Sequence, residues 1–128
     1  MEFEGRVIKA GTAQGVALVS TQPMGFLGGV DPESGCVIEP GHALEGQSIA
    51  DRVLVFPTGK GSTVGSYTLD RLASAGQAPA AILTAESEAI VAVGAIISDI
   101  PMVDQVEITR IRTGDRVYID GARVRVER

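Results

Sequence analysis

Cysteine and histidine are almost missing from this sequence of 128 residues, which contains one of each, Cys36 and His42. A single cysteine excludes a disulfide within the chain. It also excludes an iron–sulfur cluster or a structural zinc site built from this chain alone, because such sites need several ligands. We therefore expect this chain to hold no metal ion by itself.

Aromatic residues and positive charge are also scarce. Aromatic residues make up 4% of the chain and tryptophan is absent, so the core has to be aliphatic. The formal net charge is −5, which argues against a nucleic-acid-binding surface, because such surfaces need clustered lysine and arginine.

Long hydrophobic runs are missing as well. The longest, residues 89–97, is about half of a membrane span. The first residues, MEFEGRVIKAG, include two acids and lack the apolar region of a signal peptide. We expect a soluble cytoplasmic protein that binds neither membrane nor nucleic acid.

The elements that are present indicate one domain over residues 1–128. Hydrophobic residues make up 45% of the chain, enough for a core of its own. Short apolar runs and helical patterns follow each other as a β-rich start, a strand–loop–helix unit, then strand, helix, strand and a final hairpin. This order predicts a mixed α/β domain with two main helices packed against β layers.

The strand–loop–helix unit is the clearest of these patterns. Val53–Phe56 is a continuous apolar run, typical of a strand buried on both faces. Pro57 ends it, a glycine-rich turn follows, and apolar residues then recur at helical spacing until Gly76. Ser62 stands where the N-cap of this helix belongs. The helix N-terminus would make the turn a ready site for an anion.

The remaining elements are shorter. Arg6–Ala10 and Val16–Ser20 predict a β-hairpin or a pair of sheet strands. Ala80–Leu83 and Ile100–Val103 predict two more strands. A strongly apolar segment, Glu88–Ile97, predicts a helix that is deeply buried or pressed against a partner, although its β-branched residues leave a strand open. Ser87 or Thr84 would cap that helix.

The C-terminal part predicts β structure. Residues 106–111 alternate in polarity, and Asp120-Gly121 is a hairpin signal. The valines and isoleucine on either side of that turn would share one face, and the outward-pointing arginines would protect a solvent-facing edge. The residues of the shared face are Val117, Ile119, Val124 and Val126, and the arginines are Arg123, Arg125 and Arg128.

Residues 21–46 are rich in glycine and proline and show little periodicity. Such a long loop is either functional or a crossover that covers a sheet edge. His42 lies in this loop without a neighbouring partner in sequence, so we favour a structural role over acid–base catalysis. Cys36 lacks any nearby group that would activate it as a nucleophile.

The turn from Gly59 to Thr63 admits three interpretations. A nucleotide-binding P-loop is rejected, because Gly61 follows Lys60 where that motif needs serine or threonine, and Leu54 stands at its first glycine. Ser62 could be an ordinary N-cap. It could also be a catalytic residue, held between Lys60 and the positive end of the helix. Since no base or metal ligand lies nearby, a partner chain would supply the rest.

The sequence of this turn and of several other segments closely resembles the small subunit of the aconitase X family. The resemblance covers nearly the whole chain and its central motif, VLVFPTGKGS, is specific. The segments that carry it are Val53–Ser62, Tyr67, Leu72, Ala78–Ile82, Val93–Ile97, Ile100–Asp104, Phe26–Pro32, Gly41-His42 and Gly46–Ser48.

The resemblance implies a fold, a reaction and a partner. The fold would be the swivelling β/β/α domain, like the small domain of aconitase. A separate large subunit would hold a [4Fe–4S] cluster and form a heterodimer or a higher assembly. The complex would be a hydro-lyase acting on a small anionic substrate. It would convert (R)-mevalonate 5-phosphate to trans-anhydromevalonate 5-phosphate in the archaeal mevalonate route to isoprenoids.

The resemblance also implies roles for residues of the turn. Ser62 would accept the proton from the carbon next to the substrate carboxylate. In aconitase itself, serine and arginine follow the catalytic serine, whereas Thr63 and Val64 follow it here. Substrate binding by Lys60, Gly61 and Thr63 is therefore a hypothesis.

Three other functions stay open from the sequence. A related small subunit serves cis-3-hydroxy-L-proline dehydratase. The chain could also be a non-catalytic scaffold. The segment Gly114–Val126 resembles the end of a phosphoryl-carrying swivel domain, but such a domain needs a histidine at the turn where Ser62 stands.

Overall fold

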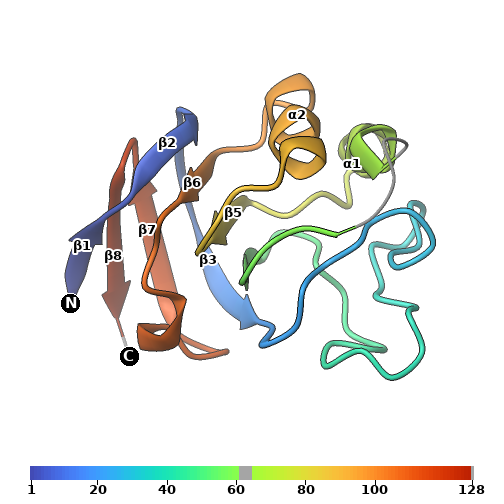
Figure 1. The fold of residues 1–128 in the computed structure, drawn as a ribbon, viewed down its shortest axis with the longest axis horizontal. Coiled ribbons are helices and arrows are strands. Elements are labelled where there is room, and N and C mark those ends of the chain that lie inside the picture. Colours follow the sequence, from blue (N-terminus) through green and yellow to red (C-terminus); the bar gives the residue numbers. More distant parts are fainter. Residues whose placement is uncertain (61–64, 128) are drawn as a thin grey trace.

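The structure is a computed structural model that describes residues 1–60 and 65–127. Within these residues it comprises an eight-stranded sheet, two α-helices on one side of it and a short 3₁₀ helix (Figure 1). The elements are β1 (Glu2–Glu4), β2 (Arg6–Lys9), β3 (Thr12–Val19), β4 (Val53–Phe56), α1 (Gly65–Ser74), β5 (Ala81–Thr84), α2 (Ala89–Ile97), β6 (Met102–Asp104), η1 (Ile108–Arg110), β7 (Arg116–Asp120) and β8 (Arg123–Glu127).

The sheet is mixed and curves back on itself. Its strand order is β1-β8-β7-β3-β4-β5-β6-β2, in which β3 through β6 run parallel and the other neighbours run antiparallel. Strands β1 and β2 are the two outer strands of this order, and only Gly5 lies between them in the sequence. The chain therefore passes directly from one end of the sheet to the other. A side chain at Gly5 would collide with the carbonyl of Asp104 and the side chain of Val103, which is why the crossing needs glycine.

The curved sheet separates two apolar cores. One core lies inside the curve and includes the face predicted for the C-terminal hairpin, Val117, Ile119, Val124 and Val126. The other lies between the parallel strands, the two helices and residues 21–50, and contains Leu54, Phe56, Leu69 and Leu72 among others. Both cores are aliphatic apart from a few phenylalanines, as the composition predicted.

The central predictions agree with this fold. Val53–Phe56 is a fully buried strand, and the helix after it, α1, ends just before Gly76, which adopts a φ of +72°. Arg6–Ala10 and Val16–Ser20 correspond to sheet strands rather than to a hairpin, because β2 pairs with β6 while β3 pairs with β4 and β7.

Helix α2 differs from its prediction in two respects. The N-cap is Glu88, not Ser87 or Thr84: its carboxylate accepts hydrogen bonds from the backbone N–H groups of Ile90 and Val91. The helix is also not deeply buried within this chain, since Val93, Ile96 and Ile97 are each about half exposed. The alternative, that it presses against a partner, stays a prediction. Its small residues, Gly94 and Ala95, face the core and allow α1 to pack closely.

The C-terminal part differs as well. Residues 106–111 alternate in polarity but form η1 rather than a strand, and Val106 and Ile111 bury their side chains at either end of that turn. The hairpin turn consists of Gly121 and Ala122, one residue later than predicted, because Asp120 pairs with Arg123. Strand β8 is not a free edge, since β1 pairs with it and Glu2 forms an ion pair with Arg123.

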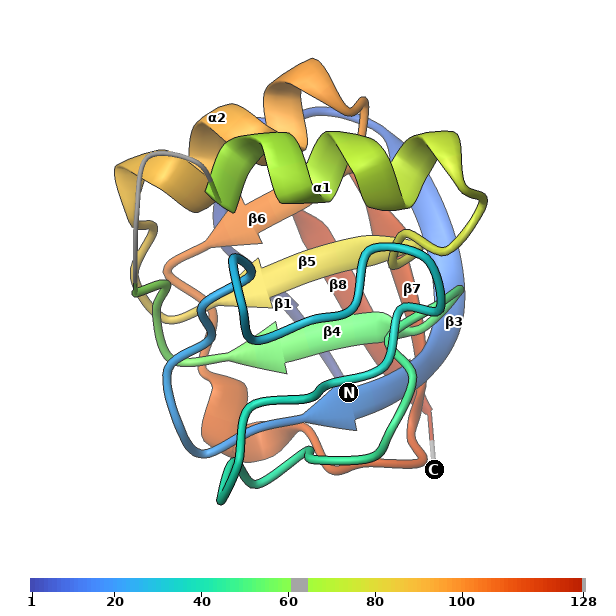
Figure 2. The same cartoon turned by 90° about the vertical axis from the view of Figure 1, so that its right-hand side faces the viewer.

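Residues 21–50 cover the helix-side face of the parallel strands rather than a sheet edge. Figure 2 shows this segment in front of β4 and β5, below α1. Buried side chains at Phe26, Val30, Val37 and Leu44 fix it to the core. Short backbone bridges, Val30 with Val37 and Cys36 with Ser48, hold its turns together. The glycine-rich sequence therefore forms an ordered layer, without helix or strand periodicity.

Candidate functional site

The parallel strands direct their carboxyl ends to one edge of the molecule. Strand β4 ends at Phe56 and the chain enters the loop Pro57–Lys60 there. Strand β5 ends beside it at Thr84, and the chain continues to the start of α2 at Ala89. Ligands of α/β sheets bind at the carboxyl ends of parallel strands, so this edge is the candidate site.

The backbone of Met24 holds the loop Pro57–Lys60 in place. The N–H of Met24 donates to the carbonyl of Thr58 at 3.1 Å, and the N–H of Lys60 donates to the carbonyl of Met24 at 2.8 Å. Met24 and Gly59 thus form a parallel β-bridge, and the Met24 side chain is buried. The loop is fixed on this side by the segment that covers the sheet.

The start of α2 holds the loop on its other side. The N–H of Glu86 donates to the carbonyl of Pro57 at 3.0 Å. A Cβ at Gly59 would lie 2.5 Å from Cγ2 of Val91 and 3.0 Å from Oε1 of Glu88. Gly59 therefore lets the loop approach the capped end of α2 more closely than any other residue would.

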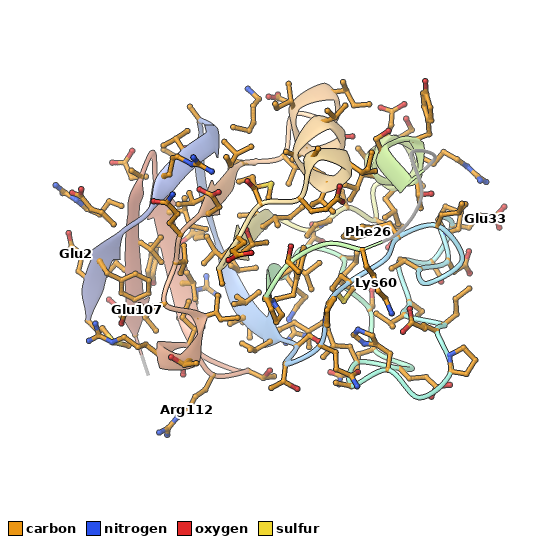
Figure 3. All side chains as sticks on the ribbon, viewed as in Figure 1. Glu2, Phe26, Glu33, Lys60, Glu107 and Arg112 are labelled. Carbon is orange, nitrogen blue, oxygen red and sulfur yellow. The ribbon has the colours of Figure 1, made fainter. Side chains whose placement is uncertain are left out.

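The side chain of Lys60 is the cationic group of this loop. Its Nζ lies 3.0 Å from Oε2 of Glu39, and the side chains of Lys60 and Glu39 are 48% and 30% exposed. Gly25 makes room for it, because a Cβ there would touch the Lys60 carbonyl and Cγ at 3.0 and 3.4 Å. In Figure 3 Lys60 lies away from Glu2 and Glu107, toward the part of the molecule that carries residues 21–50. The amine is held in place yet open to solvent, so an anion can reach it.

Of the residues predicted for the site, the structure places Lys60. Ser62, Gly61 and Thr63 lie outside the described residues. The described chain stops at Lys60, at the carboxyl edge of β4, and resumes at Gly65, the first residue of α1.

A buried carboxylate lies at the same edge. Asp104, at the end of β6, accepts hydrogen bonds from Nη2 and Nε of Arg6 at 2.6 and 3.0 Å, and its side chain is almost completely buried. These bonds, together with hydrogen bonds that Ser87 donates to the carboxylate, lower the pKa of Asp104 despite its burial. A paired carboxylate with a lowered pKa is a poor base, so Asp104 fastens β2 to β6 rather than moving protons.

Asp31 has a similar structural task in the covering segment. The backbone N–H of Glu33 and the hydroxyl of Ser34 donate to its carboxylate at 3.1 and 2.9 Å and lower its pKa. The Asp31 carboxylate is therefore a turn cap and not a proton acceptor at neutral pH.

The part of the chain that the structure describes offers neither a metal-binding cluster nor a membrane-spanning helix. Within residues 1–60 and 65–127, histidine, cysteine, aspartate and glutamate side chains do not gather in groups of three or more that could hold a metal ion. Neither helix of that part of the chain has the length and hydropathy needed to cross a bilayer.

Sequence reasoning missed the side chains that surround Lys60. Glu39 contacts it from 21 positions away in sequence, and Gln22 and His42 link the segments on which Glu39 and Met24 lie. Loops without periodicity give no signal for such contacts. The pointers to this region were the segments of the family resemblance that lie in it, Phe26–Pro32, Gly41-His42 and Gly46–Ser48. They did not identify the contacts themselves.

Comparisons with known proteins cover the whole chain. A family model described as the aconitase X swivel domain matches residues 2–128. A protein of Thermococcus kodakarensis named phosphomevalonate dehydratase small subunit is 52% identical over 127 residues, which span 99% of this chain and 96% of the relative. A protein of Methanothrix thermoacetophila with the same name is 53% identical over 125 residues, spanning 96% and 91%.

A solved structure supports the same assignment. The crystal structure of Thermococcus kodakaraensis aconitase X in its holo-form matches this fold with a TM-score of 0.98 and 49% identity, over 100% of this chain and 99% of that one. The predicted fold, a swivelling β/β/α domain with mixed β layers and two main helices, is thereby confirmed.

Proposed function

Because this chain belongs to the aconitase X swivel domain family, we propose that it is the small subunit of a phosphomevalonate dehydratase. The complex removes water from (R)-mevalonate 5-phosphate and yields trans-anhydromevalonate 5-phosphate. The observation that carries this proposal is the identity of about half of all residues, along the full chain, with relatives of that name. The word "small" in their name supports a larger partner subunit.

In this proposal Ser62 is the proton acceptor. Its oxygen takes the proton from the carbon next to the substrate carboxylate, and the electron pair of that C–H bond forms the new double bond as the hydroxyl leaves the neighbouring carbon. A serine oxygen needs positive surroundings to act as a base. Two groups could provide the positive charge. One is the ammonium of Lys60, two residues before Ser62, and the other is the N-terminal end of α1, which begins three residues after it.

The departing hydroxyl needs an electrophile that this chain does not provide. With Cys36 alone, and without a cluster of metal ligands in the described residues, the chain does not fit a [4Fe–4S] cluster. We place that cluster on the large subunit, where it supplies the Lewis acid for the hydroxyl. The small subunit then contributes the base and part of the anion site.

The first test is reconstitution. Anaerobic co-expression with a large subunit encoded beside this chain is expected to give a complex that dehydrates mevalonate 5-phosphate, whereas each chain alone is inactive. The measurement is product formation by mass spectrometry. Turnover by the isolated small subunit would contradict the proposal. A stable complex that instead dehydrates cis-3-hydroxy-L-proline would move the substrate assignment to that relative.

A second prediction concerns Lys60 as part of the anion site, together with Gly61 and Thr63. Replacing Lys60 with alanine removes a charged hydrogen-bond donor, so KM for mevalonate 5-phosphate should rise by about ten- to a hundredfold. The fold of the small subunit should not change, because the Lys60 side chain is half exposed. Size-exclusion chromatography of the variant with the large subunit checks that the complex still assembles.

The matched control for this variant is Lys9→Ala. Lys9 is the other lysine of the chain and also forms an ion pair at 3.0 Å, with Asp99. It ends β2, which runs antiparallel to β6, and so it lies at the opposite edge of the sheet. Its replacement should leave KM unchanged. Equal kinetics of Lys60→Ala and wild type would remove Lys60 from the anion site.

A further inference from the structure

His42 is buried, with 7% of its surface exposed, and both ring nitrogens have partners. Nδ1 accepts a hydrogen bond from the backbone N–H of Leu44 at 3.1 Å. Nε2 lies 3.0 Å from the carbonyl oxygen of Pro23, which can only accept, so Nε2 carries the proton. This assigns the neutral Nε2–H tautomer. A ring in this state has no nitrogen left to exchange protons with a substrate.

The hydrogen bond to Pro23 connects His42 with the candidate site. Pro23 precedes Met24, whose backbone forms the bridge to Thr58 and Lys60. A second bond joins the same two segments, because the N–H of Ala43 donates to Oε1 of Gln22 at 2.7 Å. Residues 42 and 43 thus hold residues 22 and 23 against the loop.

The same turn reaches Lys60 directly. Glu39, three residues before His42, forms the ion pair with Nζ of Lys60, and the N–H of His42 donates to the carbonyl of Glu39 at 3.2 Å. Lys60 is therefore held at both ends, its backbone through Met24 and its amine through Glu39. His42 is hydrogen-bonded to Glu39 and to Pro23, the residue before Met24.

We infer that His42 is a positioning residue for Lys60 in the anion site, acting through Pro23 and Met24. The inference rests on the proposed function for its kinetic consequence, but its structural basis is independent of that function. A lysine side chain has several rotatable bonds, and fixing its backbone and its amine in advance reduces the entropy lost when an anion binds.

Two substitutions separate the two hydrogen bonds of His42. In His42→Asn the side-chain oxygen can replace Nδ1 as the acceptor for Leu44, but the amide is too short to reach Pro23. In His42→Gln the side-chain amide can reach toward Pro23 and donate to its carbonyl. We expect His42→Asn to raise KM for mevalonate 5-phosphate about three- to tenfold, with kcat changed less than about twofold. His42→Gln should restore most of the loss.

Amide hydrogen exchange of the two-chain complex, read by mass spectrometry, tests the structural basis without activity. His42→Asn should speed exchange in peptides that contain Met24 and Lys60 more than His42→Gln does. Peptides that contain Ala17 serve as the reference. The Ala17 N–H donates to the carbonyl of Asp115 in the core inside the curved sheet, away from the loop, so its exchange reports any global loss of stability. The exchange difference should remain after that loss is subtracted.

The outcomes are distinguishable. If peptides that contain Met24 and Lys60 exchange at the same rate in His42→Asn as in His42→Gln, the inference is overturned. So does an unchanged KM in His42→Asn when Lys60→Ala raises KM. If Lys60→Ala itself leaves KM unchanged, Lys60 has no part in the anion site and the kinetic side of the inference falls with it. If the complex turns over a different substrate, the exchange difference alone decides whether His42 positions the loop.

Discussion

Replacing Ser62 with alanine is expected to lower kcat of the two-chain enzyme by about two to four orders of magnitude. Alanine is close to serine in size and favours helix formation, so the variant loses only the hydroxyl oxygen. If that oxygen takes the substrate proton, the carboxylates and the imidazole around the loop are poor replacements, because they are already engaged. Asp104 is paired with Arg6, and Glu39 is paired with Lys60. Glu88 caps α2, and both ring nitrogens of His42 have partners. The measurement is single-turnover product formation under anaerobic conditions.

The control for this variant is Ser74→Ala. Ser74 lies at the other end of α1, on its exposed surface, so the substitution changes the same helix without touching the site. Loss of an N-cap would cost Ser62→Ala about 1 kcal/mol of stability, which a thermal melt detects separately. Activity near that of wild type in Ser62→Ala would reduce Ser62 to a helix cap and assign the base to the large subunit.

The sequence predicted the parts of the fold that depend on local patterns. Val53–Phe56 was identifiable as a buried strand because it is apolar throughout and ends at Pro57. The end of α1 was marked by Gly76, whose positive φ favours glycine. Both signals lie within a few residues of the element that they define, and for that reason they could be interpreted without any tertiary contact.

Predictions failed where a tertiary contact decides the local structure. Residues 106–109 alternate as a strand would, but the chain forms η1 from Ile108 and buries Val106 and Ile111 on either side of it. The N-cap of α2 was expected to be serine or threonine. Glu88 takes that place: its carboxylate accepts hydrogen bonds from the N–H groups of Ile90 and Val91. The general preference for serine and threonine at N-caps therefore did not identify this cap.

The candidate site was predictable only in part, for the same reason. The glycines and the lysine of its loop form a motif, and the family resemblance assigned them a function. Glu39, Gln22 and Pro23 belong to the covering segment and contact the site only after that segment folds over β4 and β5. Their roles depend on contacts between segments that are distant in sequence, and hydrophobic periodicity carries no information about such contacts.

Gly59 provides the second large effect that we expect. Gly59→Ala would place a methyl group 2.5 Å from Cγ2 of Val91 and 3.0 and 3.2 Å from Oε1 and Cβ of Glu88. Contacts this short force the loop or the start of α2 to move. We expect a loss of about 1–3 kcal/mol in the free energy of unfolding, measured by denaturant titration of the small subunit in complex with its partner.

The same displacement should reduce catalysis beyond its effect on stability. Gly59 adjoins Lys60 and is three residues from Ser62, and a shift of about 1 Å in a positioned group can cost a hundredfold in rate. We therefore expect kcat/KM to fall at least tenfold at a temperature where the complex is folded. The double variant Gly59→Ala with Val91→Ala removes Cγ2 and should recover part of the activity, whereas Val91→Ala alone leaves a cavity but keeps the loop in place. If Gly59→Ala has the stability and kcat/KM of wild type, the loop tolerates displacement, and close packing against Glu88 and Val91 does not position the site.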